Sequence, residues 1–288
     1  MTPLDTEPAL RIASLHVHPV KSCAGVSVQD AWLCDTGLEL DRWWMVVDEH
    51  GEFVSQRELP RMALVQTRVR HDDVVLRAPG MLALHLQQDR VEGAVRVRVW
   101  DDEMPAFDMG DLAAQWFSDF LGRRLRLARI DPDTRRLASA RWTGGLEAKT
   151  AFSDGFPLLV ASTASLTELN RRLTAAGQAA VPMERFRPNI VIDGLADAHG
   201  EDHIETLTID SPDGAVVLKL VKPCSRCSIP DVDPATAETG RAVTDALATY
   251  RADPRLDGAL TFGQNAVIVS GIDCRIAVGA RIRAALAF

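Results

Sequence analysis

The chain has 288 residues, a length that suits two domains, although a single β-rich domain can reach this size. Its hydrophobic content of 47% with 25% charged residues is that of an ordinary globular protein, which excludes a wholly disordered or low-complexity chain. The formal net charge of -8 argues against general affinity for nucleic acid or an anionic membrane, because such affinity needs a basic face. A site for an anion must therefore be local.

The N-terminal segment, residues 1–8, is acidic and contains proline, without the basic and apolar pattern of a signal peptide. No later run approaches the roughly 20 apolar residues of a membrane span. We therefore expect a cytoplasmic protein with no membrane partner. The five cysteines are an odd number with one close pair, unlike a secreted disulfide framework, so we expect reduced thiols.

Short β-rich runs alternate with turn signals between residues 11 and 100, which predicts an antiparallel β structure for the first half. The segment 48–51 ends in Gly51, whose tolerance of positive φ suits a hairpin turn. The strands expected here are 12–20, 43–48, 64–70, 74–77 and 95–100.

The first helix is expected over residues 112–121, with Asp111 as its cap and Gly122 at its end. Leu112, Trp116 and Phe120 recur on one face of it. We place the domain boundary just after this helix, which gives an N-terminal part of residues 1–125 and a C-terminal part of residues 126–288.

The second helix is expected to start near Ser165, which has capping-box spacing to Glu168, and to end before Gly177. Further strands follow, at residues 189–193, 216–221, 266–270 and 281–285. The fold class predicted is therefore mainly β, of the α+β type: a β-barrel-like N-terminal module and a second β-rich domain with a few helices.

The segment 222–233 concentrates reactive side chains between two apolar stretches. Pro223 and Pro230 each restrict the residue before them to extended conformations, so we expect a rigid loop in which neither helix nor regular strand runs through the thiols. A loop that holds Cys227 beside Arg226 and Lys222 favours the thiolate, because nearby positive charge stabilises deprotonated sulfur.

Cys224 and Cys227 are separated by two residues, a spacing shared by zinc knuckles, dithiol redox motifs and coincidence. A structural zinc site normally needs a second ligand pair at finger-like distance, which is not evident. A thioredoxin-like site requires a helix after the pair, which Pro230 opposes. Dithiol redox chemistry is left open but not favoured, and the simplest interpretation is two small buried thiols, the common fate of a free cysteine.

Three cations, Lys21, Arg42 and Arg187, stand where predicted strands start or stop. Any one of them is most simply a solvated surface charge. Together, set among prolines, hydroxyls and amides, they predict a site for a phosphate or another anion. Asn189 and Asn265 are secondary candidates beside apolar strands, equally suited to strand-end hydrogen bonds.

These residues lie in ordered motifs by which the sequence resembles the MOSC-domain proteins, specifically the amidoxime-reducing and 6-hydroxylaminopurine-reducing enzymes that carry an N-terminal MOSC β-barrel module. The resemblance spans nearly the whole chain. The motifs are His18-Pro-Val-Lys-Ser-Cys23, Leu40-Asp-Arg-Trp-Trp44, Gln56-Arg57, Phe186-Arg-Pro-Asn189, Cys224-Ser-Arg-Cys227, Val232-Asp-Pro234 and Phe262-Gly-Gln-Asn265.

The resemblance implies a molybdenum cofactor, a metal-bound molybdopterin with a phosphate, whose metal takes one thiolate from the protein. The corresponding residue is Cys227, and a soft thiolate suits a dithiolene-bound metal. Arg226 and Asp231 are the further catalytic candidates, Asp231 as a proton relay or, equally, as a cap of backbone N–H groups. The cofactor-binding residues implied are Lys21, Ser22, Arg42, Asp154 (a weaker match), Arg187, Asn189, Ser225, Arg226 and Asn265. Pyridoxal phosphate binding accompanies the family as a label only.

The chemistry implied is reduction of a small N-hydroxylated substrate, in which oxygen is removed from an N–O bond. The chain has no four-cysteine cluster motif, so the electrons are expected from a separate ferredoxin-like or flavoprotein-like donor. Other MOSC domains are linked to cofactor sulfuration, which leaves a non-catalytic sulfur or cofactor carrier as an alternative. A thiol or zinc-binding module is a third.

Overall fold

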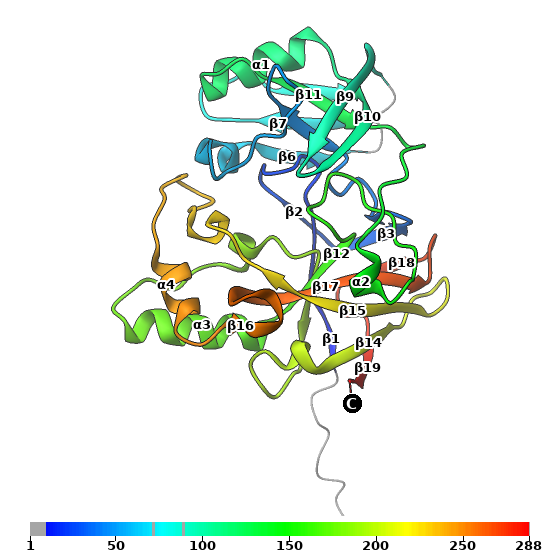
Figure 1. The fold of residues 1–288 in the computed structure, drawn as a ribbon, viewed down its shortest axis with the longest axis vertical. Coiled ribbons are helices and arrows are strands. Elements are labelled where there is room, and N and C mark those ends of the chain that lie inside the picture. Colours follow the sequence, from blue (N-terminus) through cyan, green and yellow to red (C-terminus); the bar gives the residue numbers. More distant parts are fainter. Residues whose placement is uncertain (1–9, 71–72, 88–89, 288) are drawn as a thin grey trace, which may run out of the picture.

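The structure is a computed structural model that describes residues 10–70, 73–87 and 90–287. The N-terminal residues 1–8 discussed above lie outside these ranges. Strands outnumber helices throughout the described residues, so the mainly β fold class predicted from the sequence is confirmed. In Figure 1 most of residues 66–130 lie in the upper half of the molecule, and the later residues lie in the lower half together with the first strand, residues 11–17.

The largest sheet contains strands from both ends of the chain. Its neighbouring strands are antiparallel except for β12 and β13, which run parallel and are connected through α3. In spatial order it consists of β19 (Ile282–Leu286), β14 (Ile204–Ile209), β15 (Val216–Ser225), β17 (Ala259–Ser270), β12 (Leu158–Ser162), β13 (Ile190–Asp193), β1 (Arg11–Val17) and β2 (Val26–Val28), with β16 (Ala252–Asp253) paired to β17.

Three smaller sheets complete the strand arrangement of the described residues. The hairpin predicted around Gly51 is confirmed, since Gly51 has a φ of 79° and Val47 pairs with Phe53. The sheets are β5 (Trp44–Val47), β11 (Arg126–Ile130), β10 (Asp102–Asp108) and β9 (Gly93–Val99); β18 (Arg275–Ala277), β3 (Asp30–Cys34) and β4 (Gly37–Leu38); and β6 (Gln66–Val69), β7 (Asp73–Arg77) and β8 (Leu84–Gln87).

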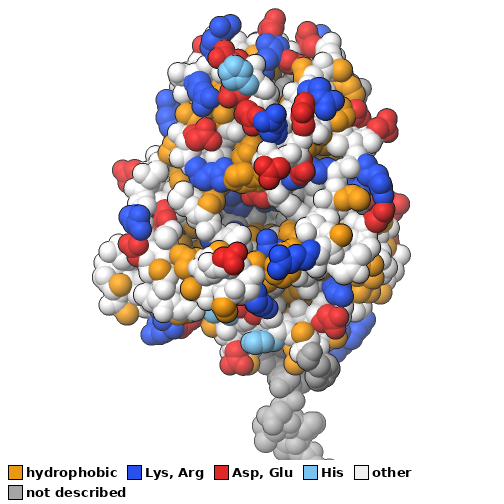
Figure 2. Space-filling model, in the orientation of Figure 1, with side chains coloured by type: hydrophobic (Ala, Val, Ile, Leu, Met, Phe, Trp, Pro, Cys, Tyr) orange, Lys and Arg blue, Asp and Glu red, His pale blue; other side chains and the backbone are white. Residues whose placement is uncertain are grey.

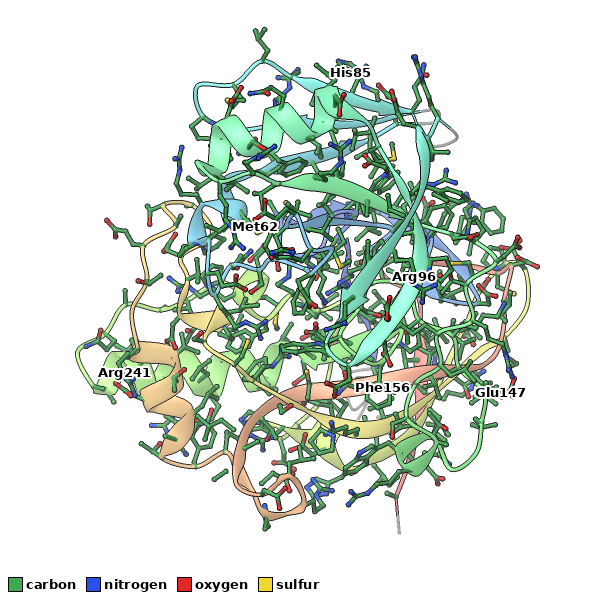
Figure 3. All side chains as sticks on the ribbon, turned by 45° about the horizontal axis from the view of Figure 1, so that its top comes forward. Met62, His85, Arg96, Glu147, Phe156 and Arg241 are labelled. Atoms are coloured by element: carbon green, nitrogen blue, oxygen red, sulfur yellow. The ribbon has the colours of Figure 1, made fainter. Side chains whose placement is uncertain are left out.

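The two parts exchange strands. β1 and β2 of the N-terminal part complete the sheet of the C-terminal part, whereas β11, just after the predicted boundary, pairs with β5 and β10 of the N-terminal part. One hydrophobic cluster includes Trp44 and Phe117 as well as Val160 and Leu218, so the core is continuous between the parts. Figure 3 shows side chains filling the space between the ribbons. The division at residue 125 stays a prediction.

The helices and 3-10 turns are mostly peripheral to the sheets. α1 and α3 each pack one apolar face on a sheet, and α4 lies against α3. They are α1 (Asp111–Leu121), α2 (Ala140–Thr143), α3 (Thr163–Ala175) and α4 (Ala242–Ala248), with η1 (Pro60–Leu64), η2 (Met183–Phe186), η3 (Gly200–His203), η4 (Ile229–Asp231) and η5 (Pro254–Leu256). None of the helices in the described ranges is both long and apolar enough to span a membrane.

Helix α1 begins one residue earlier than predicted. Asp111 is its first residue and makes no capping hydrogen bond, because its carboxylate pairs with Arg126 at 3.0 Å instead. Leu112 is 75% exposed and does not belong to the buried face, a correction to the predicted stripe. Gly122 ends the helix in the left-handed conformation, as predicted.

The capping box predicted for α3 is wrong. The helix begins at Thr163, and Ser162 is the residue whose side chain accepts the N–H of Ser165. Ser165 turns its own hydroxyl inward to Glu201 at 2.7 Å, while Glu168 pairs with two arginines on the helix surface. The buried Glu201 carboxylate accepts hydrogen bonds from both Ser162 and Ser165, so the two hydroxyls are tied to a residue distant in the sequence.

The prediction that no regular strand runs through the thiols is also wrong for Cys224. Strand β15 continues through Pro223 and Cys224 to Ser225. Pro223 has no N–H to donate to the neighbouring strand. It is tolerated because the pairing of β15 with β17 shifts register on both sides of it, and fewer hydrogen bonds join the strands at such bulges. Cys227 lies beyond the strand end, just before η4.

Candidate functional site

A single pocket brings together ten of the eleven residues that the sequence proposes for the site. It lies between the two parts, where Figure 2 shows the surface hollowed, with basic and hydrophobic side chains around the hollow. Its empty space is about 860 Å³, including the portion open to solvent. The ten residues are Lys21, Ser22, Arg42, Asp154, Arg187, Asn189, Ser225, Arg226, Cys227 and Asn265.

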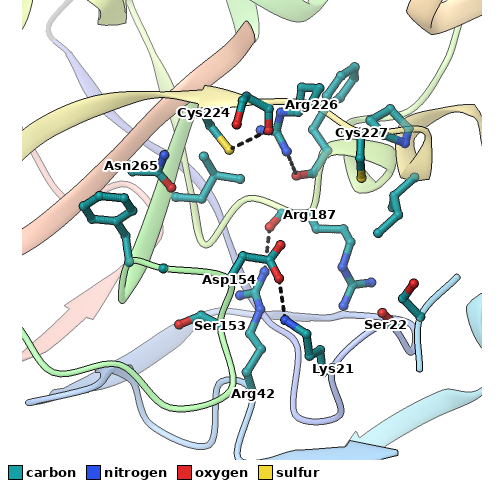
Figure 4. Close-up of a pocket in the computed structure, with 18 of the residues that line it drawn as sticks. Lys21, Ser22, Arg42, Ser153, Asp154, Arg187, Cys224, Arg226, Cys227 and Asn265 are labelled. Carbon is teal, nitrogen blue, oxygen red and sulfur yellow. Dashed lines mark hydrogen bonds and ion pairs between the residues drawn. The ribbon is translucent and has the colours of Figure 1, made fainter. Parts of the chain in front are cut away.

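Lys21 lies in the loop after β1 and is buried at the pocket floor. Its Nζ donates to the carbonyl of Phe152 at 2.8 Å and to Asp154 Oδ1 at 2.5 Å (Figure 4). Burial lowers the pKa of Lys21, and the adjacent Asp154 carboxylate opposes that shift. Desolvation acts to raise the pKa of Asp154, whose side chain is 70% exposed, but Lys21 outweighs it and holds the pKa below its ordinary value. The two side chains form an ion pair in the pocket wall.

Arg42 links the N-terminal loop to the segment before β13. Its Nη1 donates to Asp41 Oδ2, and its Nη2 donates to the carbonyl of Arg187 at 3.1 Å. Asp41, which is buried, also accepts the backbone N–H of His18 at 2.8 Å. One carboxylate thereby fixes both the arginine and the loop that carries Lys21.

Arg187 has a free hydrogen-bond donor in the pocket wall. Its Nη1 donates to the carbonyl of Cys23 at 2.5 Å, whereas Nη2 is buried and has no hydrogen-bond partner among the described residues. Burial, then the neighbouring Arg42, lowers the pKa of Arg187 to about 10, so the guanidinium is still charged at neutral pH. A buried, charged N–H without a partner is costly, which indicates that the site is built for an anion.

Ser22, Arg42 and Arg187 share an uncommon backbone conformation, with φ of 65°, 54° and 55°. Left-handed conformations are unfavourable for residues with a side chain, and they concentrate at ligand sites. Three neighbouring cases in one wall support a ligand-binding role.

The two asparagines are partly used by the protein itself. Asn189 Oδ1 accepts the N–H of Leu159 at 3.1 Å, and its Nδ2 donates to the carbonyl of His16. Asn265 Nδ2 donates to the carbonyl of Lys222 at 3.3 Å. Both asparagines also line the pocket. Their positions therefore fit the hydrogen-bonding role at strand ends and also a contact with a ligand, the two roles that the sequence left open.

The two thiols of the pocket lie on either side of Arg226 in Figure 4. Cys227 is exposed, whereas burial raises the pKa of the half-buried Cys224 thiol. All five cysteines are free. In the described chain no group of three or more His, Cys, Asp or Glu side chains is arranged to hold a metal ion.

The cations that the sequence places beside Cys227 have other partners. Arg226 donates from Nε and Nη2 to the carbonyl of Phe262 and from Nη1 to that of Phe186. The Nζ of Lys222 lies 5.4 Å from the ring centroid of Trp142. Arg226 therefore fixes the loop before Cys227 by tying it to β17 and η2.

Asp231 is the predicted site residue that lies outside the pocket lining. It is buried, and its Oδ1 accepts the backbone N–H groups of Val243 at 3.0 Å and Thr244 at 3.1 Å. These are N–H groups of the first turn of α4, which have no partner within the helix. Asp231 therefore caps α4, the kind of role that the sequence left open beside proton relay.

Sequence reasoning missed several residues that shape the pocket. Arg136 is buried, pairs with Asp102 at 2.7 Å and donates to the carbonyls of Ala151, Ser153 and Asp154. It holds the segment that presents Asp154, but the pair Arg135-Arg136 after a turn gives no sequence signal of this. Arg57 belongs to the motif Gln56-Arg57 but was not proposed for the site, and other lining residues that were missed are Phe53, Ser55, Ser153, Phe156 and Arg185.

The lining is strongly basic in an acidic protein. Among the described residues it includes one acidic side chain, that of Asp154, against a formal net charge of -8 for the whole chain. The basic lining residues are Lys21, Arg42, Arg57, Arg185, Arg187 and Arg226. The local anion site expected from the sequence therefore has a structural counterpart, while the role of each residue stays a prediction.

Comparison with known proteins defines the family. The MOSC N-terminal beta barrel domain matches residues 9–124, and the MOSC domain matches residues 147–284. The chain therefore belongs to the family of MOSC proteins that carry both domains, as the sequence motifs indicated.

Individual relatives agree with this assignment. The chain is 35% identical over 250 residues to human mitochondrial amidoxime reducing component 2. The alignment covers 83% of this chain and 72% of that protein. It is 30% identical over 283 residues to the molybdenum cofactor sulfurase of Arabidopsis thaliana, covering 89% of this chain and 33% of that protein. Among solved structures, the YUAD protein of Bacillus subtilis matches 95% of the chain at 10% identity with a TM-score of 0.39, too low to support an argument.

Proposed function

We propose that the pocket binds a molybdenum cofactor and that the protein is a molybdenum-dependent reductase of small N-hydroxylated compounds. The observation that carries the proposal is the wall formed by Arg187, Arg42 and Lys21 opposite the exposed thiol of Cys227. The buried, unpartnered Nη2 of Arg187 fits a phosphate, and a free thiol fits a soft metal. The relative named as an amidoxime reducing component supports the reaction class.

In this proposal each residue has a distinct task. Arg187, with Ser22, binds the phosphate of the cofactor, while Arg42 and Lys21 hold the loops that shape this end of the pocket. Cys227 supplies the single protein thiolate to the metal, and Arg226 keeps the loop before it in place. When bound, the cofactor supplies two-electron reduction chemistry at molybdenum.

The remaining parts of the proposal concern partners and location. A small N-hydroxylated substrate enters through the part of the pocket that is open to solvent. The electrons come from a separate ferredoxin-like or flavoprotein-like donor. The cytoplasmic location expected from the sequence stays a prediction.

The test is metal analysis with pterin fluorescence on protein purified from a host that makes molybdenum cofactor. We expect molybdenum and pterin near one per chain in the wild type, and reduction of benzamidoxime with a reduced viologen dye as donor. Folded wild-type protein from such a host that contains neither metal nor pterin would overturn the proposal.

A second candidate is a cofactor or sulfur carrier without reductase activity, favoured by the similarity to a molybdenum cofactor sulfurase. The exposed thiol of Cys227 is accessible enough to hold a persulfide. Mass spectrometry decides between the two: a persulfide on Cys227 together with no turnover favours the carrier, whereas an unmodified thiol with turnover favours the reductase.

A further inference from the structure

A cluster of aromatic and basic side chains at the pocket rim has no part in the proposed function so far. It consists of Phe53, Arg57 and Trp100. The Arg57 guanidinium lies 4.5 Å from the ring centroid of Trp100 and 5.7 Å from that of Phe53, and the two rings meet edge to face at 4.9 Å. Aromatic faces on one side thus hold the guanidinium in a fixed orientation.

Arg57 lines the pocket and keeps donors available. Its Nε donates to Ser55 Oγ at 3.1 Å, and none of the ion pairs found among the described residues includes it. Neighbouring arginines differ: Arg98 pairs with Glu52 at 2.9 Å, and Arg123 pairs with Asp48 at 3.2 Å. A guanidinium with its fork free, oriented by stacking, is suited to bind a carboxylate or phosphate.

Trp100 is held in a conformation that the turn itself does not favour. It follows β9 in the two-residue connection to β10 and has a φ of 56°, uncommon for a bulky residue. Its Nε1 donates to Asp154 Oδ1 at 3.2 Å, the same oxygen that Lys21 contacts. The hairpin tip is thus fixed against the pocket edge, and Trp100 orients Arg57 from outside the lining.

We propose that Arg57, oriented by Trp100, is a specificity-determining residue that binds an anionic substituent of the substrate at the pocket rim. The inference rests on the proposed function and adds to it a substrate class: N-hydroxylated compounds that carry a carboxylate or phosphate away from the reacting group. The same chemistry would serve the phosphate of the cofactor, so the experiment must separate these two sources.

The first measurement is binding, which does not depend on turnover. Benzoate and benzamide are titrated against the cofactor-loaded protein by tryptophan fluorescence, with Trp100→Phe identifying the part of the signal due to Trp100. We expect wild type to prefer benzoate, Arg57→Gln to lose the preference, and Arg57→Lys to keep part of it. Arg98→Gln, which removes an arginine that pairs with Glu52 on the hairpin that carries Trp100, is the matched control and should keep the preference.

The second measurement is the ratio of kcat/KM for 4-carboxybenzamidoxime to that for benzamidoxime. Arg57→Gln should lower this ratio about tenfold, the effect of one lost charge-assisted hydrogen bond at a partly exposed site. An unchanged ratio, or a benzoate preference that survives in Arg57→Gln, overturns the inference. A loss of molybdenum and pterin from Arg57→Gln assigns the residue to the cofactor phosphate and likewise overturns it.

Failure of the reductase proposal gives a different pattern. A wild type that reduces neither amidoxime but prefers benzoate through Arg57 contradicts the proposed reaction and supports the anion subsite. A wild type that reduces both amidoximes without any dependence on Arg57 supports the reaction and contradicts the subsite.

Discussion

At the scale of single residues, the two thiols of the pocket differ in their surroundings. Cys227 is exposed at the end of the loop that Arg226 fixes, whereas Cys224 lies half-buried on β15. Burial raises the pKa of the Cys224 thiol, which disfavours the thiolate that a metal requires. These differences support Cys227 as the ligand.

The corresponding prediction compares two substitutions. Cys227→Ala should lower kcat at least about 100-fold, because a metal ligand is lost, while the far-UV circular dichroism spectrum is preserved. Cys224→Ala should retain much of the activity. Reductase assays normalised to protein concentration check both, and equal tolerance of the two changes would refute the ligand assignment.

Arg187 allows a prediction that separates an effect on cofactor content from an effect on stability. Arg187→Met removes a charge that is buried with one N–H unsatisfied, so cofactor content should fall sharply. In the cofactor-free protein the variant loses the hydrogen bond to the carbonyl of Cys23, which lowers stability. It also no longer buries a charge, which raises stability by a similar amount. Its Tm should therefore stay within about 4 °C of wild type.

Molybdenum analysis and thermal unfolding of the cofactor-free protein are the measurements. A large fall in Tm with unchanged cofactor content would instead mark Arg187 as a structural residue that does not bind the cofactor.

At the scale of elements, Asp231 and α4 illustrate how a conspicuous carboxylate is used. Asp231→Ala leaves two N–H groups of the first turn of α4 without partners, which should cost about 1–2 kcal/mol of unfolding free energy. Asp231→Asn keeps one acceptor oxygen and should cost less. Because Asp231 lies outside the pocket lining, turnover per bound molybdenum should be unchanged in both.

Urea denaturation and kcat per molybdenum test this assignment. A large loss of kcat in Asp231→Asn, at full cofactor content and near-normal stability, would restore the proton-relay role.

His199, just before η3, should make the unfolding free energy depend on pH. Its ring packs between Tyr250 and Phe262, and burial, then Arg251, lowers its pKa to about 4 from the usual 6.5. As the pH falls, His199 therefore binds a proton in the unfolded chain before it does so in the folded protein. The contribution of the neutral, buried His199 ring to stability is complete above about pH 6.5 and is lost as the pH falls toward 4. The slope reaches at most about 1.4 kcal/mol per pH unit.

His199→Asn removes this titration, and asparagine tolerates the left-handed conformation found here, with φ of 61°. The unfolding free energy of the variant should change less between pH 6.5 and 4.5 than that of wild type. Denaturation curves at several pH values check the slope, and parallel pH profiles would show that His199 does not contribute. Asp202 and Arg172, which face the ring, are present in both proteins.

The elements also show what the sequence could and could not predict. The turn at Gly51 and the helix end at Gly122 follow from local backbone preferences, so both were predicted. β12 was not, because all five of its residues are buried and such a run does not alternate. The pocket cations Lys21, Arg42 and Arg187 were found through motifs, whereas the role of Arg136 depends on contacts with distant segments that no local pattern contains.

At the scale of the whole molecule, the exchange of strands makes the two parts depend on each other. The pocket needs Lys21 and Arg42 from the N-terminal part and Arg187 and Cys227 from the C-terminal part. β1 supplies antiparallel pairing to β13, and β11 supplies it to β5 and β10. Separating the chain at residue 125 would therefore leave unpaired strand edges and an incomplete pocket in both pieces.

This interdependence predicts a single cooperative unfolding transition for a chain long enough for two domains. Five of the six tryptophans, at positions 32, 43, 44, 100 and 116, lie before residue 126, so fluorescence reports mainly on the N-terminal part. Far-UV circular dichroism reports on both parts. Because one hydrophobic cluster crosses between them, the two urea-unfolding curves of the cofactor-free protein should coincide. A fluorescence transition separated from the dichroism transition would show that the exchanged strands do not couple the parts, and fragments 1–125 and 126–288 should then fold independently.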